Sequence, residues 1–222
     1  MGLLNRVLDE MSKMKNIRFA GIHFHIGSQI TDMTAFRDLC IRANDLQDEL
    51  EARGIKIENM NFGGGLGIDY NHPNHLCIPE FENYFAVFHK LYKRREGQHV
   101  HFELGRSIVG QCGSLISKVL YVKKGEIKQF AILDAGFTEL IRPAMYDAYH
   151  HMENITGNGK FDTYDVVGPI CESSDVFGKD VKLNEVRRND LIAFRSAGAY
   201  GEIMASQYNC RRLPKSYFSD TL

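Results

Sequence analysis

The pattern of apolar residues changes at residues 99–106, which are His-Val-His-Phe-Glu-Leu-Gly-Arg. Before this stretch, segments with apolar residues at helical spacing alternate with short apolar runs, which are typical of buried strands. After it, nearly every segment has the pattern of a strand or a turn. Alternating strands and helices form parallel sheets, whereas runs of strands form antiparallel ones. The sequence therefore predicts an α/β part, residues 1–108, followed by a mostly β part, residues 109–222.

The first part contains three predicted helices, in which apolar residues recur every three or four positions. Thr31 or Asp32 is suited to cap the second helix, and Gly54 is suited to end it. Pro79 is predicted at the first position of the third helix, where its missing N–H costs no hydrogen bond. The helices are predicted over residues 3–14, 33–53 and 79–92.

Three strands are predicted between these helices, over residues 17–26, 55–62 and 99–104. Their apolar runs are almost continuous, which predicts parallel strands that are covered on both faces. A closed (β/α)8 barrel needs about 250 residues. Three parallel strands with their helices therefore predict either a small open sheet or a piece of a longer chain.

The second part contains predicted strands joined by turns. Residues 115–123 and 126–134 have the pattern of a hairpin that turns at residues 123–126. Further strands are predicted over residues 163–168, 181–186 and 191–195.

Charge and cysteine content argue against several classes of protein. The 222 residues carry a formal net charge of -1, which gives no electrostatic reason to expect a nucleic-acid or anionic-membrane partner. No apolar run approaches the roughly 18 residues of a membrane span. The first residues have a helical pattern with acidic side chains, which is not that of a signal peptide. The five cysteines form no CxxC pair, which favours a cytoplasmic location over a disulfide framework or a zinc site.

A histidine motif ends the first predicted strand. His23 and His25 lie two residues apart, so their side chains share one face of the strand. They could bind a metal, although no further ligand lies at metal-binding spacing. They could also be hydrogen-bonded in a core, or His25 could stack on a planar ligand while Ser28 donates to an anion. The sequence leaves the last two alternatives open and predicts no metal site.

Two further motifs follow the second and third predicted strands. The run Gly63-Gly64-Gly65-Leu66-Gly67 is typical of a tight turn, or of a backbone cradle whose N–H groups bind phosphate. Glu103 and Arg106 form either a surface ion pair or a site in which Glu103 holds a protonated aromatic nitrogen and Arg106 binds an anion. Each motif by itself allows both interpretations.

The motifs of the second part are weaker. Arg142-Pro-Ala-Met-Tyr146 offers a cation and a phenol. Cys171, in Cys171-Glu172-Ser173-Ser174-Asp175, is either a small buried apolar residue or a reactive one. Tyr208 is either a core aromatic with a satisfied hydroxyl or a ligand contact.

The order of the motifs, rather than any one of them, resembles the fold-type III pyridoxal-phosphate decarboxylases, most closely the branch that acts on diaminopimelate. The resemblance covers residues 15–214. It implies that the first part is the C-terminal part of an alanine racemase-like (β/α)8 TIM barrel and that the second is an incomplete, Greek-key-like β domain. The segments that carry it are His23–Gln29, Asn61–Gly67, Glu103–Arg106, Asp134–Phe137, Arg142–Tyr146, Gly168–Asp175 and Ser196–Gly201 with Tyr208-Asn209.

The resemblance implies a site for pyridoxal 5'-phosphate. His25 would stack on the pyridine ring, and Glu103 would pair with the ring nitrogen and keep it protonated. Ser28 and the backbone at Gly65 would hold the phosphate. Contacts to the cofactor are implied for His25, Ser28, Gly64, Gly65, Glu103, Gly105, Arg106 and Tyr208.

The resemblance also implies a reaction, the decarboxylation of meso-2,6-diaminopimelate to L-lysine by a homodimer with its active site at the interface. Cys171 would deliver the proton that replaces carbon dioxide, and Glu172 would bind the distal ammonium, both in the site of the partner subunit. Catalytic roles are implied for His25 and Cys171. Contacts to the substrate are implied for Arg106, Arg142, Tyr146, Glu172 and Tyr208.

Arg142 and Glu172 together match a zwitterion at the far end of the substrate. Three alternatives to this function remain. The first is a sister decarboxylase that acts on carboxynorspermidine or another basic amino acid. The second is a non-catalytic regulator that keeps the dimer surface, and the presence of Cys171 beside Glu172 argues against it. The third is a gene fragment with no stable fold, because exposed barrel strands are unpaired edges that aggregate.

The sequence departs from the family pattern in two places. Leu104 stands where the family usually has Pro. Unlike Pro, Leu carries a backbone N–H and does not fix φ. The family's cofactor lysine lies upstream in an aromatic-Ala-x-Lys signature, which is absent here. Four lysines of the first part, Lys13, Lys15, Lys56 and Lys90, are not in that context. We therefore expect the chain to be truncated at both ends and, by itself, inactive.

Overall fold

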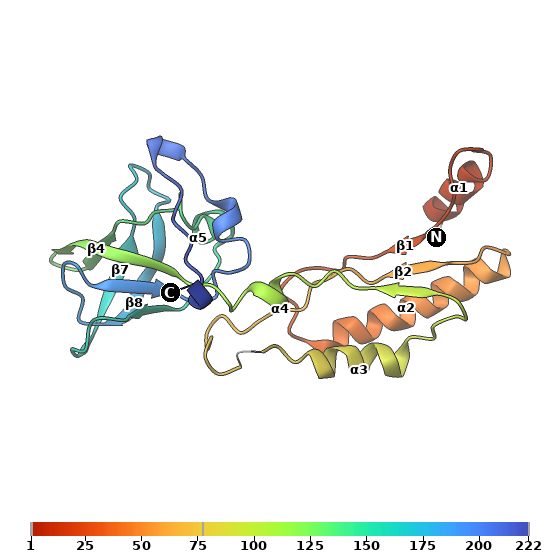
Figure 1. Cartoon of the computed structure of the whole chain (residues 1–222), viewed down its shortest axis with the longest axis horizontal. Helices are drawn as coiled ribbons and strands as arrows, with labels where there is room; N and C mark the ends of the chain where they lie inside the picture. Colours follow the sequence, from red (N-terminus) through yellow and green to blue (C-terminus); the bar gives the residue numbers. More distant parts are fainter. Residues whose placement is uncertain (1, 77, 222) are drawn as a thin grey trace. The chain divides into compact units, whose positions relative to one another are not determined.

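The computed structural model describes residues 2–76 and 78–221. They form two compact units, which are coloured by sequence in Figure 1. The first unit comprises Met1–Gly67 and Glu80–Gly105, and the second comprises Ile68–Pro79 and Arg106–Leu222. The chain thus leaves the first unit at residue 68 and returns to it at residue 80.

The first unit contains three helices, α1 (Gly2–Met11), α2 (Met33–Ala52) and α3 (Phe81–Leu91). The Asp32 carboxylate caps α2 by accepting from the Thr34 N–H at 2.8 Å. Gly54 follows α2 with a φ of +76°, which favours glycine and ends the helix. The prediction for Pro79 is wrong, because α3 begins at Phe81 after Glu80, whose ψ of 62° is not helical.

Three short parallel strands form the sheet of this unit in the order β1 (Gly21–His23), β2 (Asn59–Asn61) and β3 (His99–His101). They are shorter than predicted, because β1 and β3 pair only with β2 among the residues that the structure describes. Hydrogen bonds between the strands continue beyond their ends, from the Phe62 N–H to His101 O and from the Glu103 N–H to Gly63 O.

The two faces of this sheet differ in chemistry, which corrects the prediction that both are covered and apolar. Figure 1 shows α2 and α3 along one face only. Apolar side chains on that face, among them Met60 and Phe62, pack against the helices. The opposite face carries polar residues at alternate positions, because successive side chains of a strand point to opposite sides. These residues are His23, His25, Asn59, Asn61, His99, His101 and Glu103.

The second unit is built on a six-stranded sheet in the order β6-β9-β4-β5-β7-β8. The predicted hairpin is confirmed as an antiparallel pair of β4 and β5. The strand β6 was not predicted, and β8 begins before the predicted residue 181. The strands are β4 (Leu115–Lys124), β5 (Gln129–Leu133), β6 (Met152–Asn154), β7 (Phe161–Val167), β8 (Val176–Asn184) and β9 (Leu191–Phe194).

This sheet curls until its two edge strands approach each other, so that it is nearly a barrel. Asn154, at the end of β6, donates through Nδ2 to Glu185 O at 3.3 Å, just beyond the end of β8. The interior is filled by buried apolar side chains, including Val119, Leu133 and Phe194. Short helical turns lie outside the sheet, namely α4 (Arg106–Val109), α5 (Arg142–Tyr146), η1 (Glu202–Met204), η2 (Tyr208–Cys210) and η3 (Ser219–Thr221). In residues 2–76 and 78–221, no helix has the length and apolar character needed to cross a membrane.

Candidate functional site

The glycine run lies at the carboxyl ends of the three parallel strands, where its backbone packs closely against the neighbouring strand ends. A Cβ on Gly63 would lie 2.2 Å from Phe24 O, and one on Gly64 would lie 2.4 Å from Glu103 O. Gly65 has a φ of +108°, and a Cβ there would lie 2.6 Å from Gly27 O. These positions require glycine, since a side chain would collide with backbone atoms. The run therefore brings the ends of β1, β2 and β3 together.

Glu103 is held at this edge by two polar neighbours. Asn61 Nδ2 donates to Glu103 Oε1 at 2.8 Å, and its Oδ1 accepts from the Gly63 N–H at 2.8 Å. His23 Nε2 lies 3.3 Å from Glu103 Oε2. The side chain of Glu103 is 54% exposed, so an oriented carboxylate at the strand ends remains open to a ligand.

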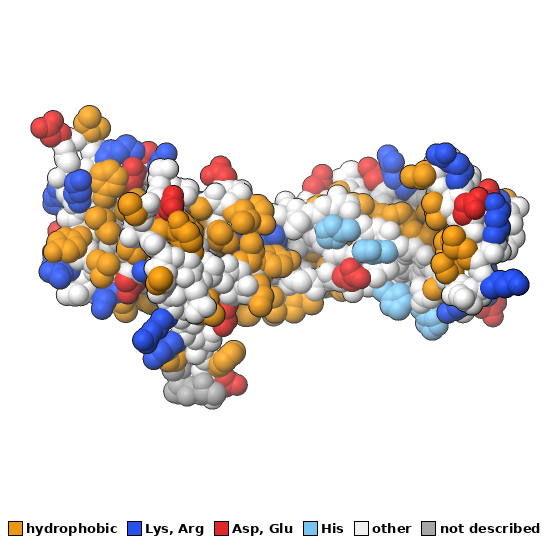
Figure 2. All heavy atoms as spheres, turned by 90° about the horizontal axis from the view of Figure 1, so that it is seen from above, with side chains coloured by type: hydrophobic (Ala, Val, Ile, Leu, Met, Phe, Trp, Pro, Cys, Tyr) orange, Lys and Arg blue, Asp and Glu red, His pale blue; other side chains and the backbone are white. Residues whose placement is uncertain are grey.

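His25 and Ser28 lie beside the same glycines. A Cβ on Gly63 would come 3.3 Å from His25 Nδ1, which places the imidazole against the start of the run. Both His25 and Ser28 are exposed, and Figure 2 shows histidine side chains gathered near an acidic one on this unit. In the described part of the chain, no three His, Cys, Asp or Glu side chains gather in a way that could hold a metal ion.

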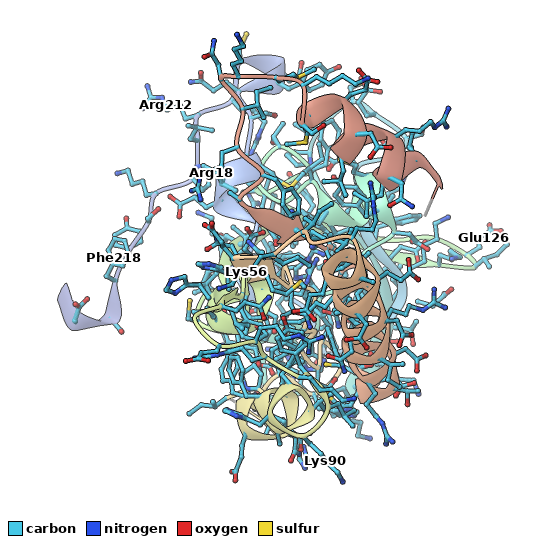
Figure 3. All side chains as sticks on the ribbon, turned by 90° about the vertical axis from the view of Figure 1, so that its right-hand side faces the viewer. Arg18, Lys56, Lys90, Glu126, Arg212 and Phe218 are labelled. Atoms are coloured by element: carbon cyan, nitrogen blue, oxygen red, sulfur yellow. The ribbon has the colours of Figure 1, made fainter. Side chains whose placement is uncertain are left out.

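Two lysines of the first unit, Lys13 and Lys90, lie on its exposed surface. Lys13 pairs with Glu10 at 2.7 Å on the exposed surface of the unit. Lys90 lies on the exposed side of α3, and Figure 3 shows it pointing outward from that helix.

Two arginines of the second unit lie against Tyr70, which belongs to the loop of residues 68–79. Arg106 donates to the Tyr70 hydroxyl, and Arg142 Nη1 donates to the same oxygen at 3.2 Å. Both guanidinium groups also lie over the Tyr70 ring, at 5.7 Å and 5.4 Å from its centroid. Arg142 is buried. Tyr146, one turn further along α5, is exposed.

His150 completes this cluster. Its Nε2 accepts from Arg142 Nη1 at 2.9 Å, and its Nδ1 donates to Arg195 O at 3.0 Å. The ring also packs edge-on against Tyr70. Burial lowers the pKa of His150 to about 4, and the nearby charges of Arg142 and Arg106 act in the same direction. His150 is therefore a neutral imidazole at physiological pH.

The depressed pKa of His150 makes stability depend on pH. The His150 imidazole binds a proton less readily in the folded state than in the unfolded chain. The contribution of neutral His150 to the free energy of unfolding is therefore full above pH 6.5 and is lost as the pH falls towards 4. We expect the free energy of unfolding to fall by about 3 kcal/mol over this range because of His150. Urea unfolding at pH 7 and pH 4.5 checks this, with His150→Gln as the non-titrating control. Equal pH dependence in both proteins would contradict the assignment.

The loop from Gly168 to Asp175 presents Cys171 and Glu172. The buried Asp175 carboxylate holds it, accepting from the Ile170 N–H and from the Phe137 N–H, each at 2.7 Å. Gly168 is required here, because a Cβ would lie 2.3 Å from Asp175 Oδ2. Burial raises the pKa of Asp175, an effect that these two N–H groups oppose.

Cys171 and Glu172 are exposed on this loop, so Cys171 is not a buried apolar residue. The Tyr208 hydroxyl donates to Glu172 Oε1 at 2.6 Å, and this hydrogen bond raises the pKa of the phenol. The Tyr208 ring also lies 5.8 Å from that of Phe137. Tyr208 is half exposed and therefore is not a core aromatic.

The predicted site residues thus form two groups, one in each unit. His25, Ser28, Gly64, Gly65 and Glu103 meet at the strand ends of the first. Gly105 is the last residue of the first unit, and Arg106 begins the longer segment of the second. In the second, Arg106 lies with Arg142, and Glu172 lies with Tyr208. Tyr146 makes no hydrogen bond or ion pair within the described residues. Four partners of these residues had no predicted role. Asn61 and Asp175 lie within motif segments, whereas no motif includes Tyr70 or His150.

Comparison with known proteins finds matching sequences over nearly the whole chain. The model of the family described as pyridoxal-dependent decarboxylase, C-terminal sheet domain, matches residues 7–198. A diaminopimelate decarboxylase of Bacteroides thetaiotaomicron is 66% identical over 219 residues, which are 99% of this chain and 57% of that protein. The chain spans about half the length of the curated relatives that it matches.

Solved structures match as well. Diaminopimelate decarboxylase from M. jannaschii in complex with L-lysine has a TM-score of 0.81 at 35% identity, covering 95% of this chain and 49% of that one. A lysine/ornithine decarboxylase from Vibrio vulnificus in complex with cadaverine has a TM-score of 0.79 at 26% identity, covering 92% of this chain and 55% of that one. Because the family model matches residues 7–198, which are most of this chain, the chain belongs to the pyridoxal-dependent decarboxylases.

Proposed function

We propose that the protein carrying this chain decarboxylates meso-2,6-diaminopimelate to L-lysine with pyridoxal 5'-phosphate as cofactor. The observation that carries the proposal is the oriented Glu103 carboxylate beside the glycine run, at the ends of parallel strands. The 66% identity to a diaminopimelate decarboxylase supports the choice of substrate.

The residues at the strand ends fit this cofactor. A planar ring needs a flat neighbour, and the exposed imidazole of His25 offers one. A phosphate needs N–H and hydroxyl donors, which a run of glycines and Ser28 supply. A ring nitrogen that must stay protonated needs a carboxylate, and Asn61 keeps Glu103 directed at this edge. Gly105, Arg106 and Tyr208 are the further residues that we assign to the cofactor.

Each residue has a separate task in the reaction. When bound, the cofactor supplies an electron sink for the pair left as carbon dioxide departs. Glu103 stabilises the positive charge on the ring nitrogen, and His25 keeps the ring in place. Cys171 gives its thiol proton to the carbon that lost the carboxylate. Arg106 and Arg142 bind the distal carboxylate beside Tyr146, and Glu172 binds the distal ammonium, oriented by its hydrogen bond from Tyr208.

Arg142 favours diaminopimelate over the alternative substrates. It is buried, and no Asp or Glu of the described residues lies within 4.0 Å of it, so its charge is not neutralised. A buried cation is costly unless an anion pairs with it. Diaminopimelate brings a distal carboxylate, whereas lysine and ornithine as substrates do not. The Cys171-Glu172 pair argues against a regulator without activity.

We further infer how the chain takes part in the whole enzyme. Residues 1–108 would be the last βα units of an alanine racemase-like (β/α)8 TIM barrel, and residues 109–222 part of a Greek-key-like β domain. The order of β1, β2 and β3 with intervening helices supports the first assignment. The enzyme would be a homodimer in which Cys171 and Glu172 serve the partner's site.

A cytoplasmic location is part of the same proposal. Cys112, Cys171 and Cys210 are exposed free thiols, and the buried Cys40 is also free, which suits a reducing compartment. Cys77 lies outside the described residues.

A replacement experiment tests the function. In the Bacteroides thetaiotaomicron relative, the 219 matched residues are exchanged for those of this chain. With pyridoxal phosphate, the exchanged protein is expected to release carbon dioxide from meso-diaminopimelate at least tenfold faster than from L-lysine or L-ornithine. These 222 residues alone are expected to release none, and borohydride is expected to fix no cofactor on one specific lysine. A preference for L-lysine or L-ornithine, or no activity, would refute the proposal.

A further inference from the structure

Among the residues that the structure describes, the buried Arg142 is held by neutral groups alone. Its hydrogen-bond acceptors are the Tyr70 hydroxyl at 3.2 Å and His150 Nε2 at 2.9 Å, both from Nη1. Two half-buried arginines of this unit, Arg195 and Arg211, are held by carboxylates. Arg195 pairs with Glu153 at 2.7 Å, and Arg211 pairs with Glu139 at 3.0 Å. Arg142 is the most deeply buried of the three, with 7% of its surface exposed, and no carboxylate of the described residues pairs with it.

The choice of a neutral acceptor has a chemical consequence. A carboxylate in the place of His150 would form a strong ion pair with Arg142 and would compete with any ligand anion. A neutral imidazole fixes the guanidinium by a hydrogen bond and leaves its charge available. The ring itself is fixed, because its Nδ1–H donates to Arg195 O, which leaves Nε2 as the acceptor.

We propose that His150 is a positioning residue, which orients Arg142 through a neutral acceptor so that the guanidinium can bind the distal carboxylate of the substrate. The inference rests on the proposed function, since it takes Arg142 as the group that binds this carboxylate. Tyr70 contributes the second neutral acceptor, and Arg106 lies on the same ring. His150 itself does not touch the substrate.

The test compares a carboxylate and an amide at position 150. The holoenzyme, wild type or variant, is titrated calorimetrically with L-lysine, the product that keeps the distal carboxylate, and with cadaverine, which has no carboxylate. His150→Glu is expected to weaken L-lysine binding at least tenfold and to change cadaverine binding less than threefold. His150→Gln keeps a neutral acceptor and is expected to weaken L-lysine binding less than threefold. Ile127→Glu adds the same charge at a position that is 94% exposed and serves as the control.

Melting temperatures separate a folding defect from the proposed effect. His150→Glu is expected to melt no lower than His150→Gln, because the new carboxylate pairs with a buried cation. Equal L-lysine affinity in the Glu and Gln variants would overturn the role of His150. Arg142→Gln identifies which proposal has failed. If Arg142→Gln leaves L-lysine affinity unchanged, Arg142 does not bind the distal carboxylate and the assigned site is wrong. If it weakens L-lysine binding, only the inference about His150 is wrong.

Discussion

Glu103→Gln in the holoenzyme is expected to lower kcat for meso-diaminopimelate by about 10²- to 10³-fold, the loss typical when one preorganised electrostatic partner of a reaction is removed. Glutamine has the shape of glutamate and can still accept the hydrogen bond from Asn61 Nδ2. It cannot carry the negative charge that keeps the cofactor's ring nitrogen protonated. The loss should therefore appear in kcat more than in the amount of bound cofactor, which absorbance measures.

The control for this variant removes a carboxylate elsewhere in the same unit. Glu49 is exposed on α2 and makes no hydrogen bond or ion pair among the described residues, so Glu49→Gln should leave kcat unchanged. Glu103→Asp keeps the charge but shortens the side chain, and an intermediate kcat is expected. If Glu103→Gln keeps kcat within threefold of the wild type while cofactor loading is full, Glu103 does not hold the ring nitrogen.

The sequence was most informative where local patterns determine structure. The apolar stripe of α2, including Phe36, Ala43 and Leu50, is buried as its spacing predicts, and Asp32 caps the helix. The glycine run and Glu103 were predicted as a pair of motifs, and they lie together because both follow parallel strands, whose carboxyl ends meet at one edge. Such features depend on residues that are near in sequence or at equivalent strand ends.

The predictions that failed depend on contacts beyond a short window. Strand lengths were overestimated, since a residue counts as strand only where a neighbour pairs with it, and β1 pairs on one side within the described chain. The polar face of the sheet was missed, because His23, Asn61 and His101 stand between apolar residues that made each run look continuous. Pro79 was assigned by a local preference that the backbone of Glu80 overrides.

The arginine cluster shows the same limit most clearly. Tyr70 lies 72 residues from Arg142, and the carbonyl that fixes the His150 ring belongs to Arg195, 45 residues away. His150 and its neighbour His151 are the histidines of a second part rich in strands, and their spacing indicates no partner. Only the folded backbone brings two neutral acceptors to Arg142 Nη1, and this makes Arg142 distinguishable from an arginine in a surface ion pair.

Two inactive variants are expected to restore each other's activity when their subunits are mixed. Cys171→Ala should lower kcat by at least about 10²-fold, since it removes a proton donor from the reacting carbon. In the proposed homodimer, each site combines Glu103 of one subunit with Cys171 of the other. A hybrid of the Glu103→Gln and Cys171→Ala subunits then holds one site with both changes and one site with neither. Random re-association of equal amounts should give about a quarter of wild-type activity.

The matched control is Cys210→Ala, which removes an exposed free thiol of the same unit and should leave kcat unchanged. The complementation result discriminates sharply, because both parent dimers are nearly inactive and the background is therefore low. If Glu103 and Cys171 of the same subunit formed a site, every site in a hybrid would carry one change, and mixing would restore nothing. Activity that stays at the sum of the two parents would therefore reject the shared site, although each single variant would still identify its residue as necessary.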